Sequence, residues 1–114
     1  MATFEILYDP AANSNYPTPD NVMRCLVRIR FSNPYVVGGE PMLATDCSAS
    51  ADANSSIVGV VFGSPISADG TIHPVWDGTN VEAWNAAVAV PVEYTAIDLS
   101  ADAKRITAEV LVSL

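Results

Sequence analysis

The sequence predicts an all-β fold of the β-sandwich or jelly-roll-like kind, with about seven to eight short antiparallel strands. Twenty-eight of the 114 residues are Val, Ile or Thr, which favour the pleated, half-buried environment of a strand. Eight prolines and six glycines interrupt the apolar runs at short intervals. No window of helical length shows a sustained three-and-four spacing of apolar residues. The length suits one domain with one core.

The most regular alternation lies between Val22 and Phe31. Apolar residues occupy every second position there, and three arginines lie among the residues between them. Because successive side chains of a strand point to opposite faces of a sheet, this pattern predicts a strand with one buried and one exposed face. The inward residues are Met23, Cys25, Val27, Ile29 and Phe31, and the outward residues are Arg24, Leu26, Arg28 and Arg30.

Three further strands are predicted elsewhere in the chain. Thr3 to Tyr8 alternates near the amino terminus, and Ile106 to Val112 alternates near the carboxyl terminus. Ile57 to Gly63 is a continuous apolar run, which predicts a central strand that is buried on both faces. Gly59 within it marks a bulge or a close backbone approach.

A hairpin is predicted in the second half of the chain. Thr71 to Trp76 and Thr79 to Trp84 flank Asp77-Gly78, a dipeptide that favours the tight turn of a β-hairpin. The best helix candidate is the alanine-rich stretch Glu82 to Ala89. Residues 9–21 and 33–56 are rich in Pro, Asn, Ser and Ala, so we expect them to form long polar loops of a single domain, residues 1–114.

Composition excludes several classes of partner. The formal charge of −8 argues against nucleic acid, since binding a phosphate backbone needs a basic surface. No apolar run approaches the roughly twenty residues of a transmembrane helix, and the start "MATFEILYDP" does not resemble a signal peptide. Only 16% of residues are charged, against about a quarter in typical soluble domains. A surface so poor in charge suggests that partners cover some of it.

Residues with catalytic or metal-binding chemistry are sparse. His73 is the only histidine, and no nucleophile motif accompanies it. We therefore expect no enzyme activity, no cofactor and no metal centre. Cys25 and Cys47 are interpreted as two reduced thiols, with a disulfide between them as the alternative.

The outward stripe of Arg24, Arg28 and Arg30 holds three of the five basic residues. One interpretation is cross-strand ion pairing, with Glu5 and Glu109 on the outward faces of neighbouring strands. The other is docking, because Arg recognises carboxylates with paired donors and is common at interfaces. The two interpretations are compatible, since three arginines and two glutamates leave one positive charge over.

Three segments carry a family resemblance: "TFEILYDP" at the amino terminus, "YVVGGEPM" from Tyr35, and "IDLSADAKRITAEVLV" from Ile97. Together they resemble small virion structural proteins of tailed bacteriophages, in particular capsid decoration or cement proteins. In these a "GGE-(P/A)-L" segment precedes a stretch of strands and a "DLS" turn leads into a final strand. Met42 stands where the family pattern has Leu, although Leu43 follows.

The resemblance implies a virion protein on the capsid surface, assembled in the host cytoplasm, which stabilises the shell by bridging copies of the major capsid protein. It also implies self-association, as a homotrimer, and no membrane partner. We expect the partner contacts to come from Arg24, Arg28, Arg30, Tyr35 and Glu40, together with the two polar loops.

Two alternative functions remain at this point. One is another virion component, from the tail or neck. The other is a carbohydrate-binding β-sandwich, in which Trp76 and Trp84 would face each other across the hairpin as a stacking platform.

Overall fold

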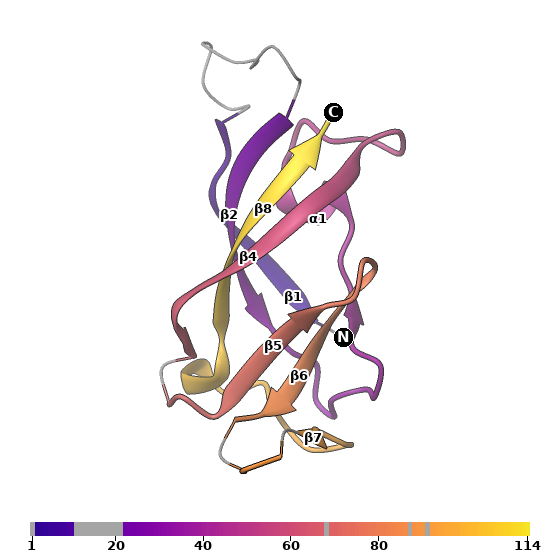
Figure 1. Cartoon of the computed structure of the whole chain (residues 1–114). Coiled ribbons are helices and arrows are strands. Elements are labelled where there is room, and N and C mark those ends of the chain that lie inside the picture. Colours follow the sequence, from indigo (N-terminus) through magenta and orange to yellow (C-terminus); the bar gives the residue numbers. More distant parts are fainter. Residues whose placement is uncertain (1, 11–21, 68, 87, 91) are drawn as a thin grey trace.

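The chain folds into two antiparallel sheets with almost no helix, so the predicted all-β class is confirmed (Figure 1). The computed structural model describes residues 2–10, 22–67, 69–86, 88–90 and 92–114. The first sheet has the order β1 (Thr3–Tyr8), β2 (Val22–Arg30), β8 (Ile106–Ser113), β4 (Ser56–Ser67). The second has the order β3 (Glu40–Pro41), β6 (Asn80–Asn85), β5 (Ile72–Trp76), and β7 (Val92–Glu93) also pairs with β6. The described residues also include a short α-helix, α1 (Ala44–Cys47), and a 3₁₀ helix (Asp102–Lys104).

The core forms where β2 and β8 lie side by side in the middle of the first sheet. Every second residue of each strand is fully buried, as the alternation predicts. Burying one such aliphatic side chain contributes about 1.5–3 kcal/mol, so these two strands supply much of the hydrophobic stabilisation. The inward residues are Met23, Cys25, Val27 and Ile29 from β2, and Ile106, Ala108, Val110 and Val112 from β8.

The second sheet and α1 cover different parts of this inner face. Ile72 of β5 and Val81 and Ala83 of β6 join the same hydrophobic cluster as the first sheet. Helix α1 lies against β1, β2 and β8, and its Cys47 is fully buried in that cluster. The two layers around one core fit the predicted β-sandwich.

Several predicted elements are confirmed and others are wrong. The bulge at Gly59 is present, because the β4–β8 register shifts between Ile57 and Gly59. The strand itself is an edge strand of the first sheet, so its predicted central position is wrong. The helix predicted at Glu82 to Ala89 is wrong, because the first four of these residues belong to β6, which pairs with β5.

The two expected polar loops have different outcomes. Residues 33–56 contain β3 and α1, so this segment is not a continuous loop. β3 has two residues and α1 has four, which is too few for a hydrophobic period to be recognised in the sequence. Most of the other loop, residues 11–21, lies outside the described residues.

Candidate docking surface

The outward stripe of β2 is engaged in ion pairs within the chain. Arg24 Nε lies 3.0 Å from Glu109 Oε1 on β8, and Arg28 Nη1 lies 3.7 Å from Glu5 Oε2 on β1. Arg28 and Glu5 are direct cross-strand partners in the β1–β2 register. The predicted ion-pairing partners are therefore confirmed. Both pairs are partly exposed, where such pairs contribute at most about 1 kcal/mol.

The third arginine of the stripe has a partner that the sequence did not reveal. Arg30 Nη2 donates to Asp102 Oδ1 at 2.5 Å, and Arg30 Nη1 donates to the carbonyl oxygen of Ser100. Arg105 Nε donates to the carbonyl oxygen of Asp102 at 3.2 Å and lies 3.9 Å from its Oδ1. The hydrogen bond and charge of Arg30, with the charge of Arg105, lower the pKa of Asp102.

All five basic residues of the chain lie in described positions, and each has an acidic partner. The fifth pair joins Lys104 Nζ to Asp69 Oδ2 at 2.7 Å, and this bond is the main cause of the lowered pKa of Asp69. Each arginine of the stripe therefore has an acidic partner, although Arg30 shares Asp102 with Arg105. Simple attraction between the stripe and an acidic partner is weaker than the sequence suggested.

Tyr35 was expected at the contact surface, but the structure buries it, so this expectation is wrong. Its side chain is 2% exposed and stacks on Phe31, with ring centroids 5.6 Å apart. Its hydroxyl donates to Glu93 Oε2 at 2.6 Å and accepts from the Ala83 N–H at 2.9 Å. Burial, followed by the bond to Glu93, raises the pKa of Tyr35 above its ordinary value. Tyr35 thus links its own loop to β6 and β7 of the second sheet and is shielded from solvent.

Glu40 is also inside the protein, so its expected role at the surface is wrong too. It is 5% exposed, and its Oε1 accepts hydrogen bonds from the backbone N–H and the hydroxyl of Ser32. Gly39 before it has φ +93°, and a Cβ there would lie 2.5 Å from the carbonyl oxygen of Val81. The Gly-Gly-Glu segment is therefore explained by close packing of this turn against β6.

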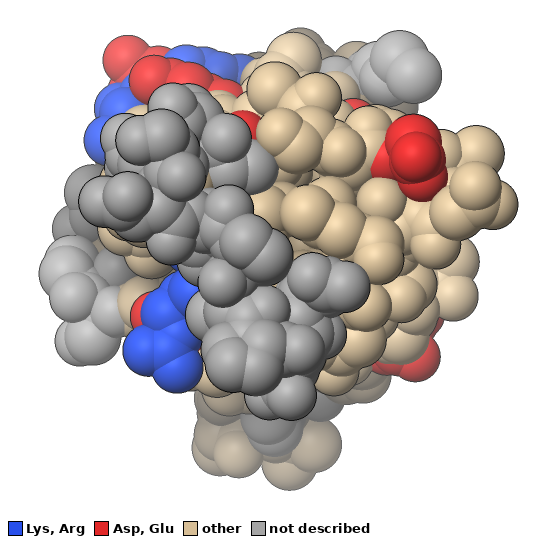
Figure 2. Space-filling model, turned by 90° about the horizontal axis from the view of Figure 1, so that it is seen from above, with Lys and Arg blue, Asp and Glu red and all other residues tan. Residues whose placement is uncertain are grey.

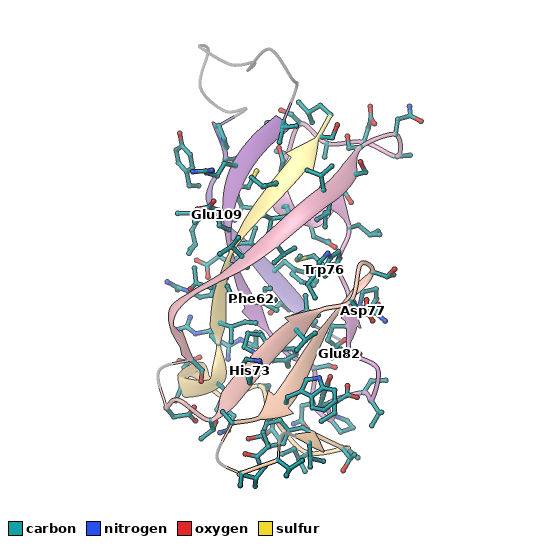
Figure 3. All side chains as sticks on the ribbon, in the orientation of Figure 1. Phe62, His73, Trp76, Asp77, Glu82 and Glu109 are labelled. Atoms are coloured by element: carbon teal, nitrogen blue, oxygen red, sulfur yellow. The ribbon has the colours of Figure 1, made fainter. Side chains whose placement is uncertain are left out.

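The predicted tryptophan platform is not formed. In the β5–β6 register Trp76 pairs with Val81 and His73 pairs with Trp84. Trp76 therefore shares the inward face with the buried Val81, and Trp84 shares the outward face with the exposed His73. The two indole rings belong to opposite faces of the sheet. Figure 3 shows His73 and Trp76 on β5, with Glu82 on the neighbouring strand.

Five exposed aliphatic residues belong to two segments of the chain that are hydrogen-bonded to each other near β7, the strand at the lower end of Figure 1. Tyr35 N–H donates to the Ile97 carbonyl at 2.8 Å, and Gly38 N–H donates to Glu93 Oε2 at 2.9 Å. We call this group the valine end. Its members, with their exposed fractions, are Val36 (57%), Val37 (57%), Val90 (75%), Val92 (58%) and Ile97 (44%).

Four further exposed apolar side chains belong to β1 and β2, on both faces of the first sheet. Ile6, Leu7 and Tyr8 of β1 and Leu26 of β2 are each more than a third exposed. β1 is an edge strand among the described strands. In the view from above, uncharged residues cover much of the visible surface on the right, interrupted by an acidic side chain, and acidic and basic side chains lie next to each other at the upper left (Figure 2).

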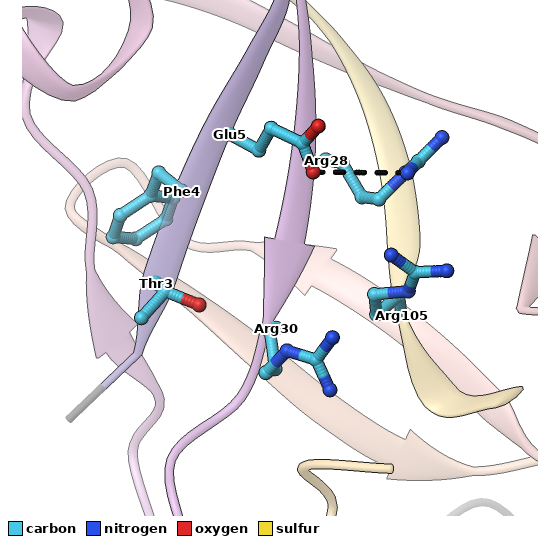
Figure 4. Close-up of a pocket in the computed structure, with 6 residues that line it drawn as sticks. All are labelled: Thr3, Phe4, Glu5, Arg28, Arg30 and Arg105. Atoms are coloured by element: carbon cyan, nitrogen blue, oxygen red, sulfur yellow. Dashed lines mark ion pairs between the residues drawn. The ribbon is translucent and has the colours of Figure 1, made fainter. Parts of the chain in front are cut away.

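Two pockets flank the start of β1. One, of about 250 Å³, is lined by Ala2, Phe4, Glu40, Pro41, Leu43 and Asp46, between the edges of the two sheets. The other, of about 80 Å³, lies on the outward side of the first sheet (Figure 4). Its lining consists of Thr3, Phe4, Glu5, Arg28, Arg30 and Arg105.

The two thiols are the remaining side chains considered for chemistry. Cys25 and Cys47 are both free and fully buried. Within the described ranges, no group of three or more His, Cys, Asp or Glu side chains is placed to hold a metal ion. No helix in the same ranges is long and apolar enough to cross a membrane.

Comparisons with protein-family models, with curated proteins and with solved structures found no match for this chain.

Proposed function

We propose that this chain is a structural virion protein that binds the outside of an assembled phage capsid and stabilises it by bridging copies of the major capsid protein. The sequence resemblance motivates the phage context. The structural observation that carries a docking role is the valine end, where four valines are each more than half exposed. Exposed apolar patches on small domains are typical of interaction sites.

The valine end is also held rigidly enough to serve as an interface. Tyr35, Gly38 and Glu93 bind its two segments to one another through the buried hydroxyl and the shared carboxylate. A preorganised apolar surface binds at lower entropic cost than one that must order on contact.

Bridging makes modest individual contacts sufficient. When one copy touches two capsid subunits, the second contact is intramolecular and benefits from a high effective concentration. Self-association as a homotrimer would multiply this effect. Size-exclusion chromatography with light scattering measures the state directly: a mass of three chains supports the trimer and a mass of one chain contradicts it.

The binding test uses heads assembled without this protein, mixed with purified chain and sedimented. We expect saturable binding to the heads by the wild-type chain. A Val37→Asp/Val92→Asp variant should lose at least about tenfold in affinity, because each charge must be desolvated at the interface. The matched control is Val58→Asp/Val61→Asp on β4, whose valines have nearly the same exposure, 56% and 59%. Absence of wild-type binding to heads would contradict the proposal.

If the wild-type chain binds purified tails or necks instead of heads, the capsid assignment is wrong. If both double variants bind heads as well as the wild type does, the valine end is not the interface.

A further inference from the structure

The pocket on the outward side of the first sheet brings together three arginines that the chain does not fully neutralise. Ile29 and Ile106 are paired in the β2–β8 register, so Arg30 and Arg105 occupy the next facing positions. Arg28 lies two residues from Arg30 on the same face of β2. Figure 4 shows the three arginine side chains, with Glu5 beside Arg28. Together with Thr3 and Phe4 these residues line a space of about 80 Å³.

Facing arginines repel each other, and like charges at cross-strand positions destabilise a sheet. Only two carboxylates balance the three arginines. Glu5 pairs with Arg28, while Asp102 is shared between Arg30 and Arg105. Three positive and two negative charges leave a local charge of +1, in a chain whose formal charge is −8.

The compensation is also incomplete in geometry. The Arg28–Glu5 and Arg105–Asp102 carboxylate contacts are 3.7 Å and 3.9 Å, longer than hydrogen bonds. Most N–H donors of these two guanidinium groups are therefore not used by a carboxylate of this chain. The arginine side chains are about one-third exposed, whereas Asp102 is 75% exposed. The three arginines line the hollow, whereas Asp102 is not among its lining residues.

We propose that this pocket binds one carboxylate of an acidic side chain on a partner protein. Guanidinium groups present pairs of donors that match the two oxygens of a carboxylate. The acidic character of the rest of the chain repels a polyanion such as nucleic acid, but a single carboxylate on a protein surface experiences mainly the local charge. That the partner is the major capsid protein rests on the proposed function. The binding of a carboxylate by the pocket does not depend on that function.

The first test is a titration of the ¹⁵N-labelled chain with N-acetyl-glutamate amide, and separately with inorganic phosphate. We expect saturable shifts with the glutamate at the backbone of Thr3 and Glu5 and at the arginine Nε–H groups. Arg28→Gln/Arg105→Gln should weaken this binding at least about tenfold, because it removes the two least compensated guanidinium groups. Arg24→Gln is the matched control, since Arg24 belongs to the same stripe but does not line the pocket.

The outcomes separate the inference from the proposed function. Unchanged spectra, equal binding by the pocket variant, or saturation by phosphate alone would each overturn the carboxylate pocket. In the sedimentation test, Arg28→Gln/Arg105→Gln should reduce occupancy on heads while Arg24→Gln retains it. Glutamate binding together with full head occupancy by the pocket variant would overturn the partner assignment. Glutamate binding with no wild-type binding to heads would reject the capsid function and leave the pocket chemistry in place.

Discussion

Replacing Tyr35 by Phe tests the interpretation of the buried hydroxyl as the link between the segments of the valine end. The substitution keeps the ring and its stacking on Phe31 but removes the oxygen. Ala83 then loses the acceptor of its buried N–H, and Glu93 keeps only the bond from Gly38. The change therefore isolates two hydrogen bonds with little effect on packing.

The expected loss in the free energy of unfolding is about 2–4 kcal/mol. Leaving a buried N–H without a partner costs about 1–3 kcal/mol, and a hydrogen bond to a charged group contributes about 1.5–3 kcal/mol. The two energetic costs do not add fully, because Glu93 is only half-buried and its carboxylate can accept a hydrogen bond from water in place of the lost hydroxyl. Small domains have about 5–15 kcal/mol in total, so the loss is a large fraction and corresponds to a fall in Tm on the order of 10 °C.

Urea unfolding followed by tryptophan fluorescence measures this loss, and Tyr8→Phe is the control because Tyr8 is 48% exposed. The pKa of Tyr35 is higher in the folded state than its unfolded value of about 10. Its contribution is therefore fully present below that value and is lost as pH rises above it. Tyr35→Phe should flatten the decline in stability above pH ~10. A loss below about 0.5 kcal/mol, or an unchanged alkaline profile, would refute the reasoning.

Two further predictions concern the turn and the thiols. In urea unfolding, Gly39→Ala should destabilise the chain by at least about 1 kcal/mol more than Gly38→Ala. Both glycines have φ above +90°, but only at Gly39 would an added Cβ overlap the Val81 carbonyl. Equal losses of stability would contradict this. Burial raises the pKa of Cys25 to about 11 and that of Cys47 to about 12. The thiols should therefore react with a disulfide reagent at pH 8 only in urea, and stability should fall as pH rises above about 9, the thiols' ordinary value; rapid reaction of the native chain would argue against their burial.

The strands could be predicted from the sequence where one face is buried and the other is not. β2 and β8 alternate strictly, because each has an inner face against the core and an outer face toward solvent. β4 could not be placed in this way. Its continuous apolar run resembles a central strand, yet it lies at the edge with Val58 and Val61 exposed. An apolar run does not by itself distinguish burial from an exposed apolar surface.

The site was predicted only in part, for a related reason. Glu5 and Glu109 were correctly predicted as partners of the arginine stripe, because alternation places them on the outward face; the register that sets Glu5 opposite Arg28 came only with the structure. The roles of Asp102 and Arg105 were missed. These residues belong to the 3₁₀ helix and the turn before β8, where no regular alternation in the sequence predicts the direction of a side chain. Tyr35 was placed outside because its segment is rich in turn residues, and only the three-dimensional contacts show its hydroxyl among buried groups.

If both surface features bind a partner as proposed, their contributions should differ in their dependence on salt. The valine end is apolar, so its contribution depends on removing aliphatic groups from water and is insensitive to moderate ionic strength. The three-arginine pocket acts through charge, which salt screens over about 8–10 Å near physiological ionic strength. A partner held mainly by the valine end should therefore stay bound as salt rises, while the pocket loses its selectivity for a carboxylate. Electrostatic contacts of this kind select orientation and partner more than they add affinity. On the proposed capsid surface, which repeats, the apolar contact would supply most of the affinity and the charged contact would select one position among the repeats.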